Sequence, residues 1–248
     1  MSKSNRILVI GDLHLPATRK GYIYFCQDLY EQWNCNQVVF IGDVFDHHAI
    51  SFHAKHPQMP GPTDEYELAL ECVKPWYKAF PKAKVCRGNH CDRIVRLAES
   101  VGIPEAFLIP LNKLYKTPNW IWDWDFVIDD IYFFHGIGNS GVHPAFNAAK
   151  KMLMSTVMGH IHTAAGIKWL ANPKRRIFAM DVSTGIDDKR MAFAYGKHAK
   201  QRSMLGAGVI IDGTPYYEPM PVGKNEEYHD SRFKGNKDGG RTGSARGR

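Results

Sequence analysis

Five short motifs built from aspartate, asparagine and histidine recur along the chain, and each follows a short apolar run. They are Asp12-Leu13-His14, Asp43-Val44-Phe45-Asp46, Asn89-His90, His135-Gly136 and His160-Ile161-His162. Residues at i and i+2 beyond a strand can point the same way, so Asp12 with His14, and His160 with His162, can each chelate an ion. Oxygen and imidazole donors without cysteine suit Mn²⁺, Fe or Zn²⁺. Two cations that share a carboxylate can activate water for phosphoryl transfer.

Each motif taken alone also has an ordinary structural explanation. The pattern GDxxD often forms a turn followed by a helix cap, a single histidine is commonly a satisfied core residue, and paired histidines on a strand commonly lie at the surface. The co-occurrence of all five motifs, each at a strand end, favours a shared site. Asp43 and Asp46 follow an apolar strand closely, and a cation would relieve the cost of burying both carboxylates.

Apolar runs alternate with amphipathic segments in the first hundred residues. Strands are predicted at 6–10, 37–41 and 83–87, and helices at 22–33, at 93–100 and from a cap at Thr63 or Asp64 toward Phe80. Pro75 is expected to kink or divide that last helix. Strands that alternate with helices predict a parallel sheet, and its carboxyl edge would carry the first three motifs.

The second half contains shorter, turn-linked strands. They are predicted at 121–124, 126–128, 131–135, 156–158, 167–170, 176–180 and 208–211, with a hairpin return at 215–218 across the turn Asp212-Gly213. One helix is predicted at 144–154, with Phe146, Ala149, Met152 and Leu153 facing inward. Alternating tryptophans at 120, 122 and 124 indicate sheet packing. Mixed crossovers and hairpins predict an α/β protein of two packed sheets with helices outside.

Composition limits the class of protein. The 248-residue chain contains no apolar run long enough to span a membrane, and its N-terminus lacks the pattern of a signal peptide, which predicts a cytoplasmic protein. Five cysteines without CxxC spacing fit a reducing compartment. Of the net charge of +7, residues 232–248 carry +5. This Gly-rich tail is either a basic arm that contacts nucleic acid or a solvated extension.

The five motifs together resemble the signature of the calcineurin-like metallophosphoesterase superfamily, which reads DxH, GDxxD, GNH[DE], a single His and GHxH. The resemblance covers roughly residues 7–181 and implies a four-layer αββα sandwich with a binuclear metal site at the strand ends. It implies two divalent ions, Mn²⁺ first and Fe, Zn or Ni as alternatives, and in-line attack by a metal-bound hydroxide on a phosphate ester. The implied metal ligands are Asp12, His14, Asp43, Asn89, His135, His160 and His162, with Asp43 bridging. His90 would act on the phosphate as a transition-state stabiliser or general acid.

One position departs from the family pattern, because Cys91 stands where an acidic residue usually follows the GNH motif. Either Asp92, one place later, orients His90 from its shifted position, or His90 lacks that acidic partner. Asp46 is expected to orient a ligand or cap a turn.

Several further residues could contact substrate. Arg93, three residues after His90, could bind phosphate. His47 or His48 could do so too, although the loop that also holds His53 and His56 could equally be solvated. The basic and aromatic segment 187–203 could grip nucleic acid or form an ordinary surface.

The sequence therefore predicts a metal-dependent phosphoesterase acting on nucleic acid or a nucleotide. A phosphomonoesterase, a non-catalytic scaffold of this fold and a nucleic-acid-binding protein are the alternatives. Residues 1–220 are expected to form the catalytic domain and 221–248 the tail. The expected partners are a phosphorylated substrate and, through the tail, nucleic acid, but no membrane. The compact format with a histidine-rich loop is also similar to phosphoesterases from phage and bacterial genomes.

Overall fold

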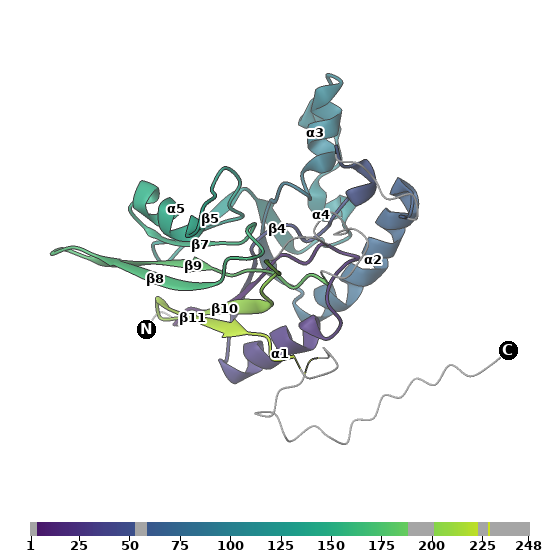
Figure 1. The fold of residues 1–248 in the computed structure, drawn as a ribbon. Coiled ribbons are helices and arrows are strands. Elements are labelled where there is room, and N and C mark those ends of the chain that lie inside the picture. The colour runs from purple at the N-terminus through teal and green to yellow at the C-terminus, as the bar shows by residue number, and fades with distance from the viewer. Residues whose placement is uncertain (1–3, 53–58, 188–200, 223–227, 229–248) are drawn as a thin grey trace, which may run out of the picture.

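The apolar runs of the sequence form the strands of two packed sheets in the computed structural model, which describes residues 4–52, 59–187, 201–222 and 228 (Figure 1). The first sheet has the order β11-β10-β1-β2-β3-β4. Its strands are β1 (Arg6–Ile10), β2 (Gln37–Phe40), β3 (Ala83–Cys86), β4 (Trp120–Asp123), β10 (Gly206–Ile211) and β11 (Thr214–Pro219). Strands β1 to β4 are parallel, as the alternation of strands and helices predicts, whereas β10 and β11 form an antiparallel hairpin at one edge.

The second sheet has the order β5-β6-β7-β9-β8. Its strands are β5 (Asp125–Ile128), β6 (Ile131–Phe134), β7 (Ser155–Met158), β8 (Gly166–Ala171) and β9 (Arg176–Asp181). β6, β7 and β9 are parallel, while β5 and β8 run antiparallel at the two edges. The carboxyl ends of β6 and β7 therefore lie at one edge of this sheet, as those of β1, β2 and β3 do in the first sheet.

Three apolar layers hold the fold together. Ile7, Val9 and Val39 of the first sheet pack against Phe133 and Met180 of the second, and all five are buried. The other face of the first sheet packs on α1 (Tyr22–Gln32) and α2 (Pro62–Ala79), and the other face of the second sheet packs on α5 (Pro144–Met152). Figure 1 shows α1 and α2 on one side of the sheets and α5 on the other. The predicted four-layer αββα sandwich is confirmed.

Two helices differ from the prediction. α2 is one helix that contains Pro75, because a single buried face that includes Val73 and Trp76 continues through the proline. Its N-cap is Gly61, followed by Pro62, so the expected side-chain cap at Thr63 or Asp64 was wrong.

α5 ends at Met152, and its buried face consists of small residues, Ala145, Ala148 and Ala149. The expected inward orientation of Met152 and Leu153 was wrong, since these side chains are 42% and 60% exposed. The alanines allow a close approach of the helix to β7 and β9.

The connection from β3 to β4 contains three short elements. α3 (Arg93–Ser100) was predicted, whereas the 3₁₀ turn η2 (Glu105–Phe107) and the helix α4 (Leu111–Leu114) were not. A further 3₁₀ turn that was not predicted, η1 (His48–Ile50), follows β2. Trp120 is buried as expected, but Trp124 lies beyond the end of β4 and is 45% exposed under the Arg87 guanidinium. No helix of the described chain is both long and apolar enough to cross a membrane.

Candidate metal centre

The five motifs follow strands whose carboxyl ends meet between the two sheets. Asp12 and His14 follow β1, Asp43 follows β2, and Asn89 follows β3; His135 follows β6 and the His160/His162 pair follows β7. Three of these residues, His14, Asp43 and His160, have φ angles of 48°, 41° and 69°. Such left-handed backbone is costly for residues other than glycine, and it is typical of functional sites.

Asp12, His14 and His162 form the first group of donor atoms. Nε2 of His162 lies 3.2 Å from Nε2 of His14 and 3.2 Å from Oδ2 of Asp12. All three residues present one ligand atom within a sphere that fits a single ion.

Asp43, His135 and His160 form the second group. Nε2 of His135 lies 2.9 Å from Oδ2 of Asp43, 3.1 Å from Oδ1 of Asn89 and 3.2 Å from Nδ1 of His160. Oδ2 of Asp43 is also 3.8 Å from Nε2 of His14 in the first group. The Asp43 carboxylate therefore lies between the two groups, where a bridging ligand would stand.

The residues present fit divalent cations. Oδ1 of Asp12 is buried and has no hydrogen-bond partner among the described residues, which leaves a buried anionic atom that can bind a cation. Several imidazole nitrogens converge at distances that a shared ion explains. Despite burial, Asp43 and Asp12 raise the pKa of His135 to about 9. A proton on His135 and a bound cation are thus alternative ways to neutralise the same carboxylates.

Asp46 holds two of the site histidines. Its Oδ1 accepts hydrogen bonds from Nδ1 of His14 at 2.9 Å and from Nδ1 of His90 at 2.6 Å. Burial alone would raise the pKa of Asp46, but these two bonds hold it well below its ordinary value. The carboxylate therefore fixes both rings and presents their Nε2 atoms to the site, which is the orienting role expected for Asp46.

His90 lies at the open side of the groups, with 14% of its side chain exposed. Its backbone N–H donates to Oδ1 of Asp43 at 2.8 Å. Burial lowers the pKa of His90, but the charges of Asp43 and Asp46 outweigh it and leave that pKa raised. With Nδ1 bound to Asp46, the ring presents Nε2 to the site, 4.0 Å from Oδ2 of Asp43.

Arg93 lies beside His90 as expected, but its guanidinium is already engaged. Nη1 donates to the backbone oxygen of Asp46 at 2.7 Å, and Nη2 lies 3.4 Å from Nε2 of His90. The side chain is only 8% exposed, so it borders the site from within the protein.

Asp92 does not replace the acidic residue missing at position 91. Its carboxylate pairs with Arg87, which also binds Glu105 at 2.7 Å, and it is Asp46 that holds the His90 ring. Of the two alternatives for Asp92, the structure does not support compensation, because this carboxylate binds Arg87 rather than His90. The thiol of Cys91 is buried, and burial raises its pKa.

His47 is turned away from the donor groups. It is 6% exposed, and its Nε2 lies 2.7 Å from the hydroxyl of Tyr115. Burial lowers its pKa to about 4, so the ring is neutral near pH 7. This placement does not support a contact between His47 and substrate, which stays a prediction. The backbone N–H of His48 donates to Glu65. His53, His56 and residues 188–200 lie outside the described part of the chain.

Three motif glycines lie so close to ligand side chains that no larger residue would fit. A Cβ at Gly42 would stand 2.3 Å from Nδ1 of His135, and one at Gly88 would stand 2.1 Å from Oδ1 of Asp43. A Cβ at Gly159 would stand 2.4 Å from Oδ1 of Asp12. The recurrence of glycine directly before Asp12, Asp43, Asn89 and His160 was the signal that could have identified this requirement.

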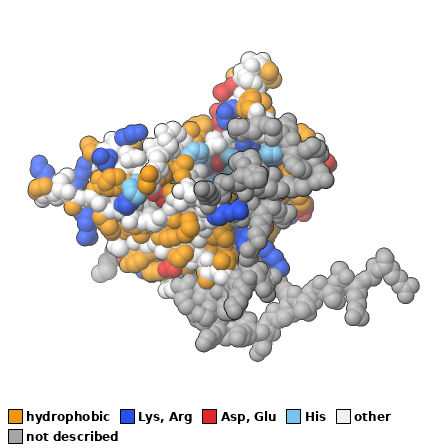
Figure 2. Space-filling view, in the orientation of Figure 1, with side chains coloured by type: hydrophobic (Ala, Val, Ile, Leu, Met, Phe, Trp, Pro, Cys, Tyr) orange, Lys and Arg blue, Asp and Glu red, His pale blue; other side chains and the backbone are white. Residues whose placement is uncertain are grey.

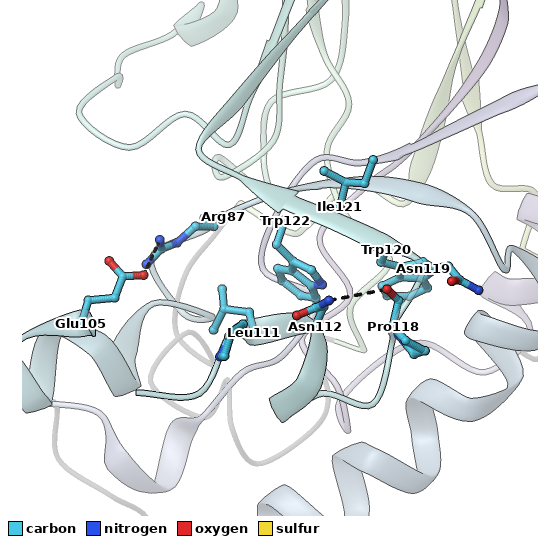
Figure 3. Close-up of a pocket in the computed structure, with 10 residues that line it drawn as sticks. Arg87, Glu105, Leu111, Asn112, Pro118, Asn119, Trp120, Ile121 and Trp122 are labelled. Carbon is cyan, nitrogen blue, oxygen red and sulfur yellow. Dashed lines mark hydrogen bonds and ion pairs between the residues drawn. The ribbon is translucent and has the colours of Figure 1, made fainter. Parts of the chain in front are cut away.

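A cavity of about 480 Å³ lies along the outer side of β4, separate from the donor groups (Figure 3). Trp122 and Leu111 form apolar parts of its wall, and Asn112 and Asn119 form polar parts. Figure 3 shows the Arg87–Glu105 ion pair at one end. None of the seven expected metal ligands lines this cavity.

The sequence profile of the calcineurin-like phosphoesterases matches residues 5–182, which include all five motifs. The chain belongs to the calcineurin-like phosphoesterase family. Membership agrees with the metal-binding character of the two donor groups, since the family typically binds divalent metals.

Several solved structures are similar in fold. Vps29 of Chaetomium thermophilum is 12% identical with a TM-score of 0.45, and the match covers 90% of this chain and 93% of that one. Vacuolar protein sorting 29 of Cryptosporidium parvum is 13% identical with a TM-score of 0.43, covering 87% and 96%. YfcE, a phosphoesterase from E. coli, is 16% identical with a TM-score of 0.36, covering 83% and 87%. A search of curated protein sequences found no match.

Proposed function

We propose that the protein hydrolyses phosphodiester bonds, in a nucleotide or a nucleic acid, with the help of two divalent cations. The observation that carries the proposal is the position of Asp43 between two complete donor groups, with His90 at their open side. A scaffold that had lost catalysis would not need both features. The complete set of donors therefore favours the enzyme over the non-catalytic alternative.

The two donor groups would each hold one ion. Asp12, His14, His162 and one Asp43 oxygen would hold the first ion, and Asp43, Asn89, His135 and His160 the second. When bound, such a pair of cations acidifies water and neutralises phosphate charge. Mn²⁺ is the first candidate because the donors are oxygen and imidazole.

His90 and Arg93 are the side chains that would act on the phosphate and its leaving oxygen. His90 is held by Asp46 through Nδ1, so its Nε2–H is available to protonate the oxygen on which the broken P–O bond leaves its electrons. The charges of Asp43 and Asp46 raise the pKa of His90, which favours the protonated ring. Arg93 lies 3.4 Å from that nitrogen, so a phosphate oxygen that reaches His90 also meets the guanidinium charge.

The test is turnover with Mn²⁺ on bis(p-nitrophenyl) phosphate and on p-nitrophenyl phosphate in parallel. Asp43→Asn serves as the blank, and Asp130→Asn, in an exposed turn, serves as the matched control. We expect faster diester turnover, retained in Asp130→Asn. Faster monoester turnover would replace the diester proposal with a nucleotidase or phosphatase. Turnover no higher than the Asp43→Asn blank on both substrates would contradict hydrolysis by this site.

A further inference from the structure

A long segment of the chain lacks carboxylates altogether. Residues 131–180 contain six lysines and arginines and no aspartate or glutamate. Residues 1–130, by comparison, contain 16 carboxylates and 14 lysines and arginines. The segment forms β6, α5, β7, β8 and most of β9, so the positive charge belongs to the second sheet and its helix.

All six basic side chains of this segment are exposed. Lys150 and Lys151 lie in the last turn of α5, Lys168 lies in β8, and residues 174–176 lie at the turn and start of β9. No ion pair within the described part of the chain includes any of them. Figure 2 shows basic side chains gathered at the left end of the molecule, over α5 and the β8–β9 hairpin.

An exposed aromatic ring lies among these charges. Trp169 is 46% exposed, and the Arg176 guanidinium lies 4.7 Å from its ring centre. The ring of Phe178, across the strand pair, supports it at 5.7 Å. A supported indole beside an arginine is a platform on which a nucleobase can stack.

The basic surface is continuous in sequence with the metal centre. A polar cavity of about 280 Å³ is lined by Gly138, Asn139, Ser140, Asn147, Lys150 and Lys151. Its first residue follows His135 by three positions, and β8 begins four positions after His162. The metal ligands follow the carboxyl ends of β6 and β7, whereas residues 174–176 lie at the amino end of the parallel strand β9. A nucleic-acid strand bound here would therefore have to run along the length of the second sheet to reach them.

We propose that α5 and the β8–β9 hairpin bind the phosphate backbone of a single nucleic-acid strand. The exposed charges match the repeating anionic groups of such a strand, and Trp169 offers a stacking contact that a lipid headgroup would not use. The binding itself does not depend on the proposed function. The idea that the bound nucleic acid leads toward the metal centre does rest on the proposed function.

The test measures binding without turnover, in the full chain that carries Asp43→Asn. The probe is a fluorescein-labelled 30-nucleotide oligothymidine, titrated by anisotropy at several NaCl concentrations. One variant changes Lys150, Lys174 and Arg175 to Gln. The matched control changes Lys78, Lys82 and Lys113 to Gln, since these are also exposed but belong to the first half of the chain.

We expect the surface triple variant to weaken binding at least about tenfold and to flatten the slope of log K against log salt by about 2, as expected when three phosphate contacts are removed. The control triple variant should keep that slope. Equal effects of the two triple variants, or no binding by the parent, would overturn the proposal. So would binding of the parent to phosphatidylserine vesicles but not to the oligonucleotide.

A second pair of variants tests the aromatic contact. Trp169→Leu should weaken oligonucleotide binding roughly tenfold, the usual effect of removing one stacked base. Trp124→Leu is the matched control, because Trp124 is 45% exposed and also lies under an arginine, Arg87, at 4.3 Å. Equal oligonucleotide binding by the two variants would contradict base stacking on Trp169. If the wild-type chain hydrolyses bis(p-nitrophenyl) phosphate but does not bind the oligonucleotide, the proposed binding surface is contradicted and the proposed hydrolysis is not. If it binds the oligonucleotide but shows no turnover, only the proposed hydrolysis is contradicted.

Discussion

The two sheets bring different chemistry to the same centre. The first sheet contributes every carboxylate of the site, Asp12, Asp43 and Asp46, whereas the second contributes only histidines. Asp12 and Asp43 are at most 1% exposed, and of the second-sheet histidines His135 is equally buried, while the His162 side chain is 21% exposed. The first sheet thus supplies buried anionic charge that can hold cations. The side of His162, in the segment 131–180 that lacks carboxylates, is the more open approach for an anionic substrate.

Asp43→Asn breaks this division most severely, because Asp43 lies between the two donor groups. We expect turnover to fall by much more than the roughly 10²-fold loss that is typical when a residue that only hydrogen-bonds to a metal ligand is replaced. Metal content, measured on the purified variant after dialysis, should fall for both ions. Full metal stoichiometry with wild-type activity would rule out a bridging Asp43.

His90→Asn tests the catalytic group of the first sheet while leaving both donor groups complete. We expect a loss of about 10²–10⁴ in rate with metal still bound. Comparing a p-nitrophenyl ester with an alkyl ester separates two roles. A loss confined to the poor leaving group identifies an acid, and an equal loss on both esters identifies a charge stabiliser. An unchanged rate on both would show that His90 has no role.

Asp46 and Asp92 both lie near the GNH motif, and replacing each in turn tests which carboxylate orients His90. Asp46→Asn should lower activity by about 10–100-fold, because Asp46 holds both His14 and His90. Asp92→Asn is the control, since this carboxylate binds Arg87 rather than His90. Steady-state kinetics of the two variants should therefore diverge, and equal losses would mean that the Asp46 bonds do not position the rings.

The smallest effect concerns Asp181, the first carboxylate after the basic segment. Burial raises its pKa to about 6, although the backbone N–H of Ala145 donates to it and Lys168 lies nearby. The folded chain therefore takes up a proton between about pH 4 and 6 that the unfolded chain does not. Stability should fall as the pH rises through this range and then stay lower.

Asp181→Asn removes this titration, and an asparagine oxygen can still accept from Ala145. The difference in unfolding free energy between pH 4 and pH 7 should shrink by about 2 kcal/mol relative to wild type. Urea unfolding at the two pH values measures it. Parallel curves for the two proteins would show that Asp181 titrates normally.

Comparison of sequence and structure shows which features are encoded locally. The positions of the buried strands along the chain follow from continuous apolar runs, and a glycine before Asp12, Asp43, Asn89 and His160 marks where these ligands emerge. The partners of Asp46, Asp92 and His47 could not be predicted, because they depend on side-chain direction after distant segments have packed. The inward orientation expected for Met152 and Leu153 failed for a related reason. Helical periodicity placed Ala149 inward correctly, but it did not indicate that Ala145 and Ala148, rather than the larger residues, would complete the buried face.

The separation of the ligands along the chain affects how the protein matures. Asp12 and His162 approach within 3.2 Å although 150 positions separate them. A growing chain therefore exposes its first ligand long before the last one exists, and no cation can be held by the full set until both sheets have docked. Bound metal then stabilises only the finished protein, by about 2.7 kcal/mol at a concentration 100 times the dissociation constant. Loading with Mn²⁺ should raise the melting temperature, so thermal denaturation can report whether folding is complete.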